Sequence, residues 1–432
     1  MTSQSQKFDV IIVGAGIVGL SGAYHILSQN PGCKVAVVEK AASAGQGDTG
    51  RTVAGLRNTF TSEVNRLLAE SSIDFYKHIQ EDLKFDLGLR FVGYLWLLTA
   101  QLAERLQPAI DRMRKDGVAL KLWRLNQLSN MLPQSRLTVD SNDEEAKLLG
   151  LCSIDMGLQG LKCGTLAAEK LVEFYEREIR RLGATIRYGE RVDSFILEPR
   201  QKLGLPREPL VWQDARVTGV VTNRGKILAE QTVLAAGCWS TDLLNNLGID
   251  SHVRVKKRQV FALRGSGVSS LLFSKGFNEQ GVLPLTLIPP HLIYLKPNQN
   301  EGTFWVGVSD HVGRPFIFEE EPITENDFYT YNIYPPMSHY FPCLKDVKPF
   351  NNWAGHYDLN TIDGNPYIFE DSGLIVADGT SGSGMMKADA IGRIIAAAHA
   401  KRDIVTLYGG KHFKVANLGI ETRQVEHEEF VI

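Results

Sequence analysis

The chain has 432 residues, with 47 Lys and Arg against 49 Asp and Glu and a formal net charge of −2. This balance gives no electrostatic basis for binding nucleic acid, and the length suffices for two domains with ample cores. Five scattered cysteines without metal-like spacing make a reducing cytoplasm the simplest location. The short polar start lacks the pattern of a secretory signal, and glycines in the uncharged run 10–27 argue against a transmembrane helix.

The first predicted elements form a dinucleotide-binding βαβ unit. An apolar strand at 10–13 leads into a glycine-rich turn and a helix, and a second apolar strand at 34–38 ends at Glu39. The turn consists of Gly14, Ala15, Gly16, Ile17, Val18 and Gly19. Its glycines permit a tight turn, close approach of the backbone to a pyrophosphate, and close packing of helix on strand. Glu39 lies 20 residues past the last glycine, where a carboxylate accepts hydrogen bonds from ribose hydroxyls.

The middle of the chain favours FAD over NAD as the dinucleotide. A predicted helix at 165–182 and a strand at 185–192 precede a hairpin around residues 223–225. The strand that follows closes in the small-residue turn 234–240, which lets it pass close to a bound dinucleotide. This order of elements is typical of a glutathione-reductase-like FAD domain.

The predicted pattern returns to the cofactor near the end of the chain. A strand at 374–378 runs into the glycine-rich loop 379–384, which opens a helix with apolar residues three and four apart. Such a loop offers N–H donors and a helix dipole to the N1–C2=O edge of a reduced flavin.

Five ordered motifs carry a resemblance to a known family. They are the turn 14–19 with Glu39, the segment 47–57, the turn 234–240, the segment 355–366, and the loop 378–387. Across essentially its whole length the chain resembles the D-amino-acid oxidase superfamily of FAD-dependent oxidoreductases, nearest the branch of sarcosine oxidase, glycine oxidase and dye-linked L-proline dehydrogenase.

The resemblance implies an α/β fold of two domains. A glutathione-reductase-like Rossmann domain, expected at 1–86, 150–250 and 351–432, would bind FAD. An inserted, mostly antiparallel sheet, expected at 87–149 and 251–350, would cover the flavin and bind the substrate. The cofactor-binding residues expected besides the turn and Glu39 are Lys40, Thr49, Arg51, Thr52, Val192, Ala236, Gly237, Trp239, Gly379, Ser381, Gly382, Gly384, Met385 and Met386.

The resemblance also implies a site for a small amino acid. A fixed cation must hold its carboxylate so that the carbon–hydrogen bond faces flavin N5, and Arg57 is the expected clamp. The alternative is that Arg57 only pairs with an acid on the adjoining helix. Tyr294 and Tyr357 would place a ring face and a hydroxyl against the substrate, although ordinary sheet packing explains Tyr294 equally well. His356 could assist deprotonation, shape the pocket or be simply packed.

At several positions the chain differs from these relatives, and the differences restrict the expected substrate and flavin sites. Tyr357 stands where D-amino-acid oxidases and glycine oxidases carry a carboxylate-binding arginine, and Gly355 stands where monomeric sarcosine oxidases link the flavin through cysteine, so noncovalent FAD is expected. Their second carboxylate-binding lysine aligns with Met386. Lys387, one residue later, is rotated by about 100° on a helix. It stays only a candidate, as does Lys296 for the lysine that oxygen-using relatives place over the flavin.

The expected activity is oxidation of a small amino acid, preferably a secondary amine such as L-proline or sarcosine, by hydride transfer to flavin N5 to give an imine. A 2-hydroxyacid dehydrogenase and a flavin-containing subunit or assembly factor of a dehydrogenase complex remain the alternatives. The electron acceptor, whether oxygen, a quinone or a dye-like carrier, is left open, as are homo-oligomerisation and peripheral association with a membrane. The apolar C-terminal residues 430–432 are expected to dock on the body of the protein, and the segment 318–341 to cap the pocket.

Overall fold

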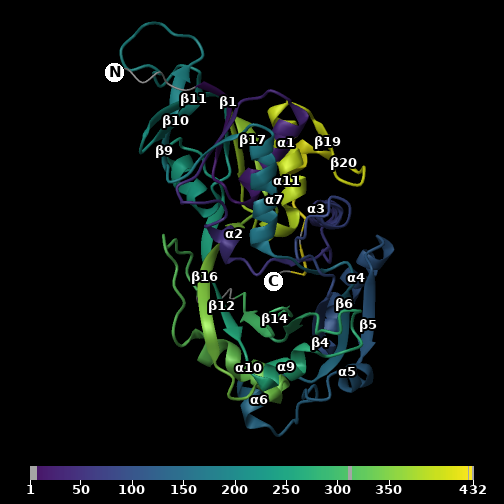
Figure 1. Ribbon diagram of the computed structural model, residues 1–432. Coiled ribbons are helices and arrows are strands. Elements are labelled where there is room, and N and C mark those ends of the chain that lie inside the picture. The colour runs from purple at the N-terminus through teal and green to yellow at the C-terminus, as the bar shows by residue number, and fades with distance from the viewer. Residues whose placement is uncertain (1–6, 310–313, 427, 431–432) are drawn as a thin grey trace.

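The computed structural model describes residues 7–309, 314–426 and 428–430, and two large sheets dominate it (Figure 1). The first sheet has the order β17-β18-β11-β1-β2-β8, and β10 and β9 continue antiparallel from β11. Strands β18, β11, β1, β2 and β8 run parallel to their neighbours, as a dinucleotide-binding fold requires. The bounds are β1 Lys7–Val13, β2 Val35–Val38, β8 Thr185–Arg187, β9 Val192–Pro199, β10 Ala215–Thr222, β11 Gly225–Leu234, β17 Tyr367–Asp371 and β18 Leu374–Asp378.

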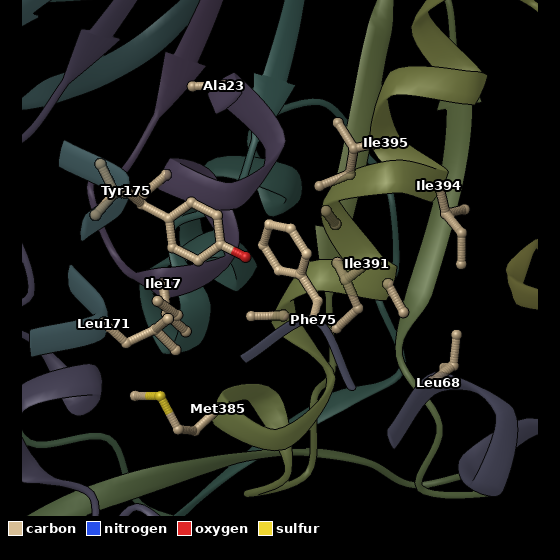
Figure 2. Packing of buried hydrophobic residues seen from close by; sticks show 14 of the residues in the cluster. Ile17, Ala23, Leu68, Phe75, Leu171, Tyr175, Met385, Ile391, Ile394 and Ile395 are labelled. Atoms are coloured by element: carbon tan, nitrogen blue, oxygen red, sulfur yellow. The ribbon is translucent and has the colours of Figure 1, made fainter. Parts of the chain in front are cut away.

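Both faces of the first sheet are buried, which explains the continuous apolar run in β1. Val10 and Ile12 join a core cluster on one face, whereas Ile11 and Val13 join a separate cluster on the other. Helices α1 (Ile17–Gln29), α3 (Glu63–Glu81), α7 (Ala168–Arg181) and α11 (Gly384–His399) contribute to the first of these clusters. Figure 2 shows Ile17, Phe75, Tyr175 and Ile391 from these helices within it.

Helix α1 packs closely along α11 because small residues line their contact. A methyl group on Gly22 would lie 3.2 Å from Cδ1 of Ile395, and one on Gly392 would lie 2.2 Å from Oγ of Ser21. The chain places the start of α1 beside the nucleotide turn and the start of α11 beside the glycine-rich loop. The contact between the helices therefore fixes these two loops relative to each other.

The second sheet has the order β16-β12-β15-β14-β13-β4-β6-β5 and is antiparallel except for the pair β13 and β4. Its bounds are β4 Tyr94–Thr99, β5 Leu120–Arg124, β6 Ile154–Gly160, β12 Val253–Leu263, β13 Leu285–Ile288, β14 Ile293–Asn298, β15 Thr303–Gly307 and β16 Pro349–Asn360. In Figure 1 it forms the lower half of the molecule, below the first sheet and its helices. The expected two-part α/β fold with an inserted, mostly antiparallel sheet is confirmed.

Two strands lie outside the domain ranges expected for them. Residues 150–250 and 351–432 were assigned to the FAD-binding domain, but β6 and nearly all of β16 hydrogen-bond within the second sheet. Sequence patterns identify a strand by its own residues, whereas its sheet depends on partners far away in the chain. The other domain boundaries stay predictions.

The remaining elements connect and cover the sheets. Two short ladders join β3 (Gly55–Leu56) to β7 (Gly164–Thr165) and β19 (Ile404–Thr406) to β20 (His412–Lys414). The other helices are α2 Asp48–Arg51, α4 Ala100–Lys115, α5 Leu125–Met131, α6 Glu144–Leu148, α8 Ser240–Asn245, α9 Ser266–Leu272, α10 Tyr334–Tyr340, η1 Gly237–Trp239, η2 Tyr329–Ile333, η3 Pro342–Leu344 and η4 Val415–Leu418. Across the described ranges, no helix combines the length and the apolar character needed to cross a bilayer.

Candidate active site

The glycine-rich turn between β1 and α1 has the backbone that a dinucleotide requires. Gly14 has a φ of +103°, and a methyl group there would lie 2.5 Å from the carbonyl oxygen of Ala235. One on Gly19 would lie 2.1 Å from the carbonyl oxygen of Gly14. Both positions therefore need glycine, for the turn and for close packing of helix on strand. Gly16 is the residue that precedes α1.

Polar side chains surround the start of α1. Oε2 of Glu39 accepts from the backbone N–H of Ala15 at 2.7 Å, so the carboxylate reaches the turn. Oγ1 of Thr49 accepts from the backbone N–H of Ile17 at 3.1 Å, at the partly positive end of the helix. The residues expected to bind ribose and pyrophosphate thus meet around one helix N-terminus.

Several other expected cofactor residues follow parallel strands at their carboxyl edge, while Arg51 lies in α2 and Gly384, Met385 and Met386 lie at the start of α11. Ala236 and Gly237 follow β11, and Val192, at the start of β9, packs with Ala236 against the second core cluster of the sheet. The ammonium of Lys40 lies 3.9 Å from the ring centre of Trp239. In the loop before α11, Gly379, Ser381 and Gly382 all have positive φ, the conformation that tight loops of this kind use.

A cavity of about 560 Å³ lies between this edge and the second sheet. Its polar lining comes from segments far apart in sequence, including Arg57 after β3, Tyr94 on β4, Tyr294 on β14, Tyr357 on β16 and Lys387 on α11. Apolar walls come from Val53, Phe60, Leu285, Phe316, Met385 and Met386. Thr52, Ser381 and Gly382, which were expected to bind cofactor, also line it.

Arg57 is held rigidly in the cavity wall. It is buried, and its two Nη atoms donate to the backbone carbonyls of Thr59 and Phe430. Its guanidinium also lies 4.0 Å from the ring centre of Phe60. Because an arginine has five N–H donors, these two bonds leave further donors for an anion. The carboxylate of Glu428 lines the same cavity.

Lys387 lines the cavity, although the position expected for a lysine is one residue earlier. Its Nζ donates to Oδ1 of Asn65 on α3 and lies 5.1 Å from the ring centre of Phe60. Burial, together with the nearby charge of Arg57, lowers the pKa of Lys387 to about 7. A large neutral fraction is therefore present near neutral pH, in which the amine can accept a proton.

Three tyrosines complete the polar wall of the cavity. Burial raises the pKa of Tyr294, Tyr357 and Tyr94, which keeps their hydroxyls protonated as hydrogen-bond donors. The ring of Tyr357 packs on Gly382, where a methyl group would lie 2.4 Å from it. The guanidinium of Arg258 on β12, also in the lining, lies 5.0 Å from the ring centre of Tyr357.

The structure places His356 away from this group. Successive residues of a strand point to opposite faces, so His356 lies on the other face of β16 from Tyr357. There its ring stacks on Phe318, and its Nδ1 faces Cys238 and Asp48. Lys296 also lies apart from the described lining. Burial lowers its pKa to about 8, and its ammonium lies 3.9 Å from the ring centre of Trp305.

The end of the chain packs on the body of the protein at Phe430, as its apolar character suggested, and it also contributes residues to the site. Phe430 is buried and packs edge-on against Trp96, while Val431 and Ile432 lie outside the described residues. Glu428 accepts from the backbone N–H groups of Thr61 and Ser62 and so caps the start of α3. Sequence reasoning missed Asn65, Tyr94, Arg258 and Glu428. The acids before Phe430 were the one available signal for Glu428.

The segment 316–321 pairs with residues around the expected cofactor site. Phe316 lines the cavity, and three consecutive glutamates pair with cations of other segments: Glu319 with Lys257, Glu320 with Lys40 and Glu321 with Arg51. The acid is half-exposed or exposed in each pair, so each contributes little by itself. The segment 318–341, which is expected to cap the pocket, contributes no residue to the described lining, because Phe316 precedes it. Residues 310–313 fall outside the described ranges.

Fold and site together define a dinucleotide-binding protein whose cavity is lined both by expected cofactor residues and by polar side chains of the second sheet. The profile of the family "DAO: FAD dependent oxidoreductase" matches residues 9–398. The chain belongs to this family, it is an oxidoreductase enzyme, and FAD is its cofactor. The family expected from the five motifs is thereby confirmed.

Similar proteins extend over most of the chain. "FAD-dependent oxidoreductase domain-containing protein 1" of Xenopus laevis is 26% identical, covering 90% of this chain and 79% of its own length. "Sarcosine oxidase subunit beta" of Rhizobium meliloti (strain 1021) is 25% identical, covering 84% and 76%. The solved structure of L-proline dehydrogenase from P. horikoshii is 21% identical and has a TM-score of 0.75, covering 96% and 97%. This last likeness shows a shared fold.

The residues present fit FAD. Gly14 and Gly19 allow the tight turn and the close packing of helix on strand that place the start of α1 at the turn, and Glu39 and Thr49 lie beside it. Nη1 of Arg51 is buried without a hydrogen-bond partner among the described residues. A buried donor of this kind is costly unless a ligand pairs with it. Burial and the neighbouring carboxyl of Asp358 raise the pKa of Asp378 well above its usual range, so one proton is held between these two acids.

Proposed function

We propose that this enzyme oxidises a small amino acid at the bond between carbon and nitrogen, with a secondary amine such as L-proline or sarcosine preferred. The observation that carries the proposal is the buried guanidinium of Arg57 in the wall of a cavity beside the nucleotide site. A carboxylate can pair with its remaining donors at little orientational cost because Thr59 and Phe430 already fix the group. The names of similar proteins, sarcosine oxidase and L-proline dehydrogenase, support the same substrate class.

The other residues of the cavity would deprotonate and position the substrate amine. The nitrogen must lose a proton before the adjacent carbon can give up a hydride, and neutral Lys387 can accept that proton through its Nζ. Tyr294 and Tyr357 would donate hydrogen bonds and press a ring against the substrate, and the apolar walls would exclude water. Bound FAD would supply the hydride acceptor. Having given one proton to Lys387 and one hydride to the acceptor, the substrate ammonium leaves as a protonated imine, which becomes the imine when it loses its remaining proton to solvent.

The FAD is expected to be held without a covalent bond at the position of Gly355. A side chain at that position would meet Cβ of Arg51 at 3.0 Å, so the backbone of β16 runs close to α2 there. The electron acceptor, whether oxygen, a quinone or a dye-like carrier, stays an open part of the proposal.

The first test is an anaerobic visible spectrum of the purified protein before and after L-proline, sarcosine, glycine, D-alanine or L-2-hydroxyglutarate is added. Bleaching of the flavin bands by a secondary amine acid supports the proposal. Bleaching by L-2-hydroxyglutarate alone would show that the enzyme oxidises an alcohol and not an amine. Bleaching by none of the five compounds contradicts the proposal.

The second test addresses Arg57 directly. Loss of two charge-assisted hydrogen bonds to the substrate carboxylate costs about 3–4 kcal/mol, so Arg57→Met should lower kcat/KM by about 10²- to 10³-fold. Arg57→Lys, which keeps the charge, should fall between this variant and the wild type. Arg264→Met changes an exposed arginine that follows β12 outside the cavity lining, and it should leave kcat/KM unchanged. Unchanged affinity of Arg57→Met for a carboxylate inhibitor would remove the assigned role.

A further inference from the structure

Three potential metal ligands meet on the face of β16 opposite Tyr357. They are Asp48 on α2, Cys238 on η1 and His356 on β16. The Sγ atom of Cys238 lies 3.1 Å from Oδ2 of Asp48 and 3.8 Å from Nδ1 of His356. This Nδ1 atom lies 3.6 Å from Oδ1 of Asp48. Cys238 and His356 are buried, and Asp48 is half-buried.

These separations approach those of a tetrahedral metal centre. With metal–ligand bonds of about 2.0–2.3 Å, donor atoms around zinc lie roughly 3.3–3.6 Å apart. The two distances to Asp48 end on different carboxylate oxygens; with one donor atom from each residue, the three atoms lie within 4.8 Å of one another, so a rotation of the Asp48 carboxylate can bring them to this spacing. We propose that Asp48, Cys238 and His356 bind one divalent ion of the zinc type, with a water molecule in the fourth position.

The ligand chemistry selects this class of ion. Thiolate and imidazole are ligands that Zn²⁺ prefers, whereas Mg²⁺ and Ca²⁺ prefer sites made of oxygen atoms alone. On binding, the thiol of Cys238 releases its proton to solvent. The carboxylate of Asp48 and the resulting thiolate then balance the two positive charges of the ion, and the imidazole stays neutral.

Binding of the ion also fixes the tautomer of His356. In the metal-free arrangement its Nε2 accepts from the backbone N–H of Glu319 at 3.4 Å, which is a long hydrogen bond. With the ion on Nδ1, the ring carries its proton on Nε2 and can no longer accept there. The ion therefore replaces a weak contact to the segment 316–321, and that segment should become more accessible when the ion binds.

The ion would join three segments that frame the cofactor. Each ligand is next in the chain to a residue of the site. Asp48 precedes Thr49, whose hydroxyl accepts from the first N–H of α1. Cys238 follows Gly237, and His356 precedes Tyr357 in the second sheet. A shared ion would tie the nucleotide-binding loops to the second sheet. Removing it should therefore speed the release of FAD from the holoenzyme.

The experiment uses holoenzyme that has been treated with a chelator, dialysed, and titrated with Zn²⁺ or Co²⁺. Metal content is measured by mass spectrometry, and the Co²⁺ protein is examined for ligand-field bands at wavelengths beyond the flavin absorption and for a thiolate-to-cobalt band. The proposal expects about one ion per chain and a thiolate band. In the wild type, absence of a stoichiometric ion or of a thiolate band overturns it.

Variants locate the ion. Cys238→Ser and Asp48→Asn are nearly isosteric, and each should weaken binding at least about tenfold. Cys343→Ser changes a half-buried cysteine outside the cluster and should bind like the wild type. Equal binding by Cys238→Ser and wild type overturns the assignment. The thiolate band of the wild type serves as the readout that needs no variant.

Discussion

Lys387 carries the sharpest quantitative prediction. It is buried at the start of α11 and has Asn65 as its hydrogen-bond partner. Its pKa falls from an ordinary value of 10.5 to about 7 because burial removes water from the ammonium. Replacing it with methionine, which has a similar length and no charge, removes this titration while keeping most of the packing.

The sign of the effect follows from proton binding. Between about pH 7 and 10.5 the unfolded chain holds the proton of Lys387 more often than the folded protein, so stability rises with pH across this window. The difference in proton binding corresponds to about 4 kcal/mol at pH 7 and about 1.5 kcal/mol at pH 9.5. Relative to Lys387→Met, the wild type should therefore gain about 3 kcal/mol between these two pH values.

Urea unfolding of both proteins at the two pH values measures this difference. Lys77→Met serves as control, because Lys77 lies on the exposed face of α3 with a side chain that is 51% exposed. The control should show the same pH dependence as the wild type. If the difference between wild type and Lys387→Met does not change with pH, the lysine is not held in a desolvated state, and its proposed role as proton acceptor loses its basis.

Two further substitutions test the cofactor turn and the C-terminal segment. Gly14→Ala should abolish FAD retention, because its methyl group would lie 2.5 Å from the carbonyl oxygen of Ala235; Gly32→Ala, which has a similar positive φ but open space, should keep the flavin spectrum. Retention of FAD by Gly14→Ala would argue against the close approach of Gly14 to the carbonyl oxygen of Ala235 as a condition for FAD binding. Phe430→Ala should lower stability by about 3–5 kcal/mol and raise KM, because the ring packs on Trp96 and the backbone carbonyl of this residue holds Arg57. Unchanged thermal unfolding and KM would show that the segment does not support the site.

The sequence by itself determined the elements whose cause is local. The nucleotide turn depends on backbone conformations that glycine adopts, and the strand and helix periods around it are properties of a few neighbouring residues. The Glu39 carboxylate could be placed for the same reason, since a fixed number of residues separates it from the turn.

Tertiary packing decided which side chains share the cavity. Lys387 points into it because contacts of α11 with α1 and α3 set the rotation of that helix, which a shift of one residue in an alignment cannot show. His356 faces away because β16 pairs with β12 in a register that directs Tyr357 inward.

The cluster of Asp48, Cys238 and His356 illustrates the same limit. Cysteine spacing along the chain showed no metal-binding pattern, because these ligands are 190 and 118 residues apart. Likewise, Glu428 and Phe430 reach the site only because the end of the chain packs against Trp96 and the start of α3. Local backbone preferences are encoded by neighbouring residues, whereas these sites depend on where the sheets and helices place distant segments.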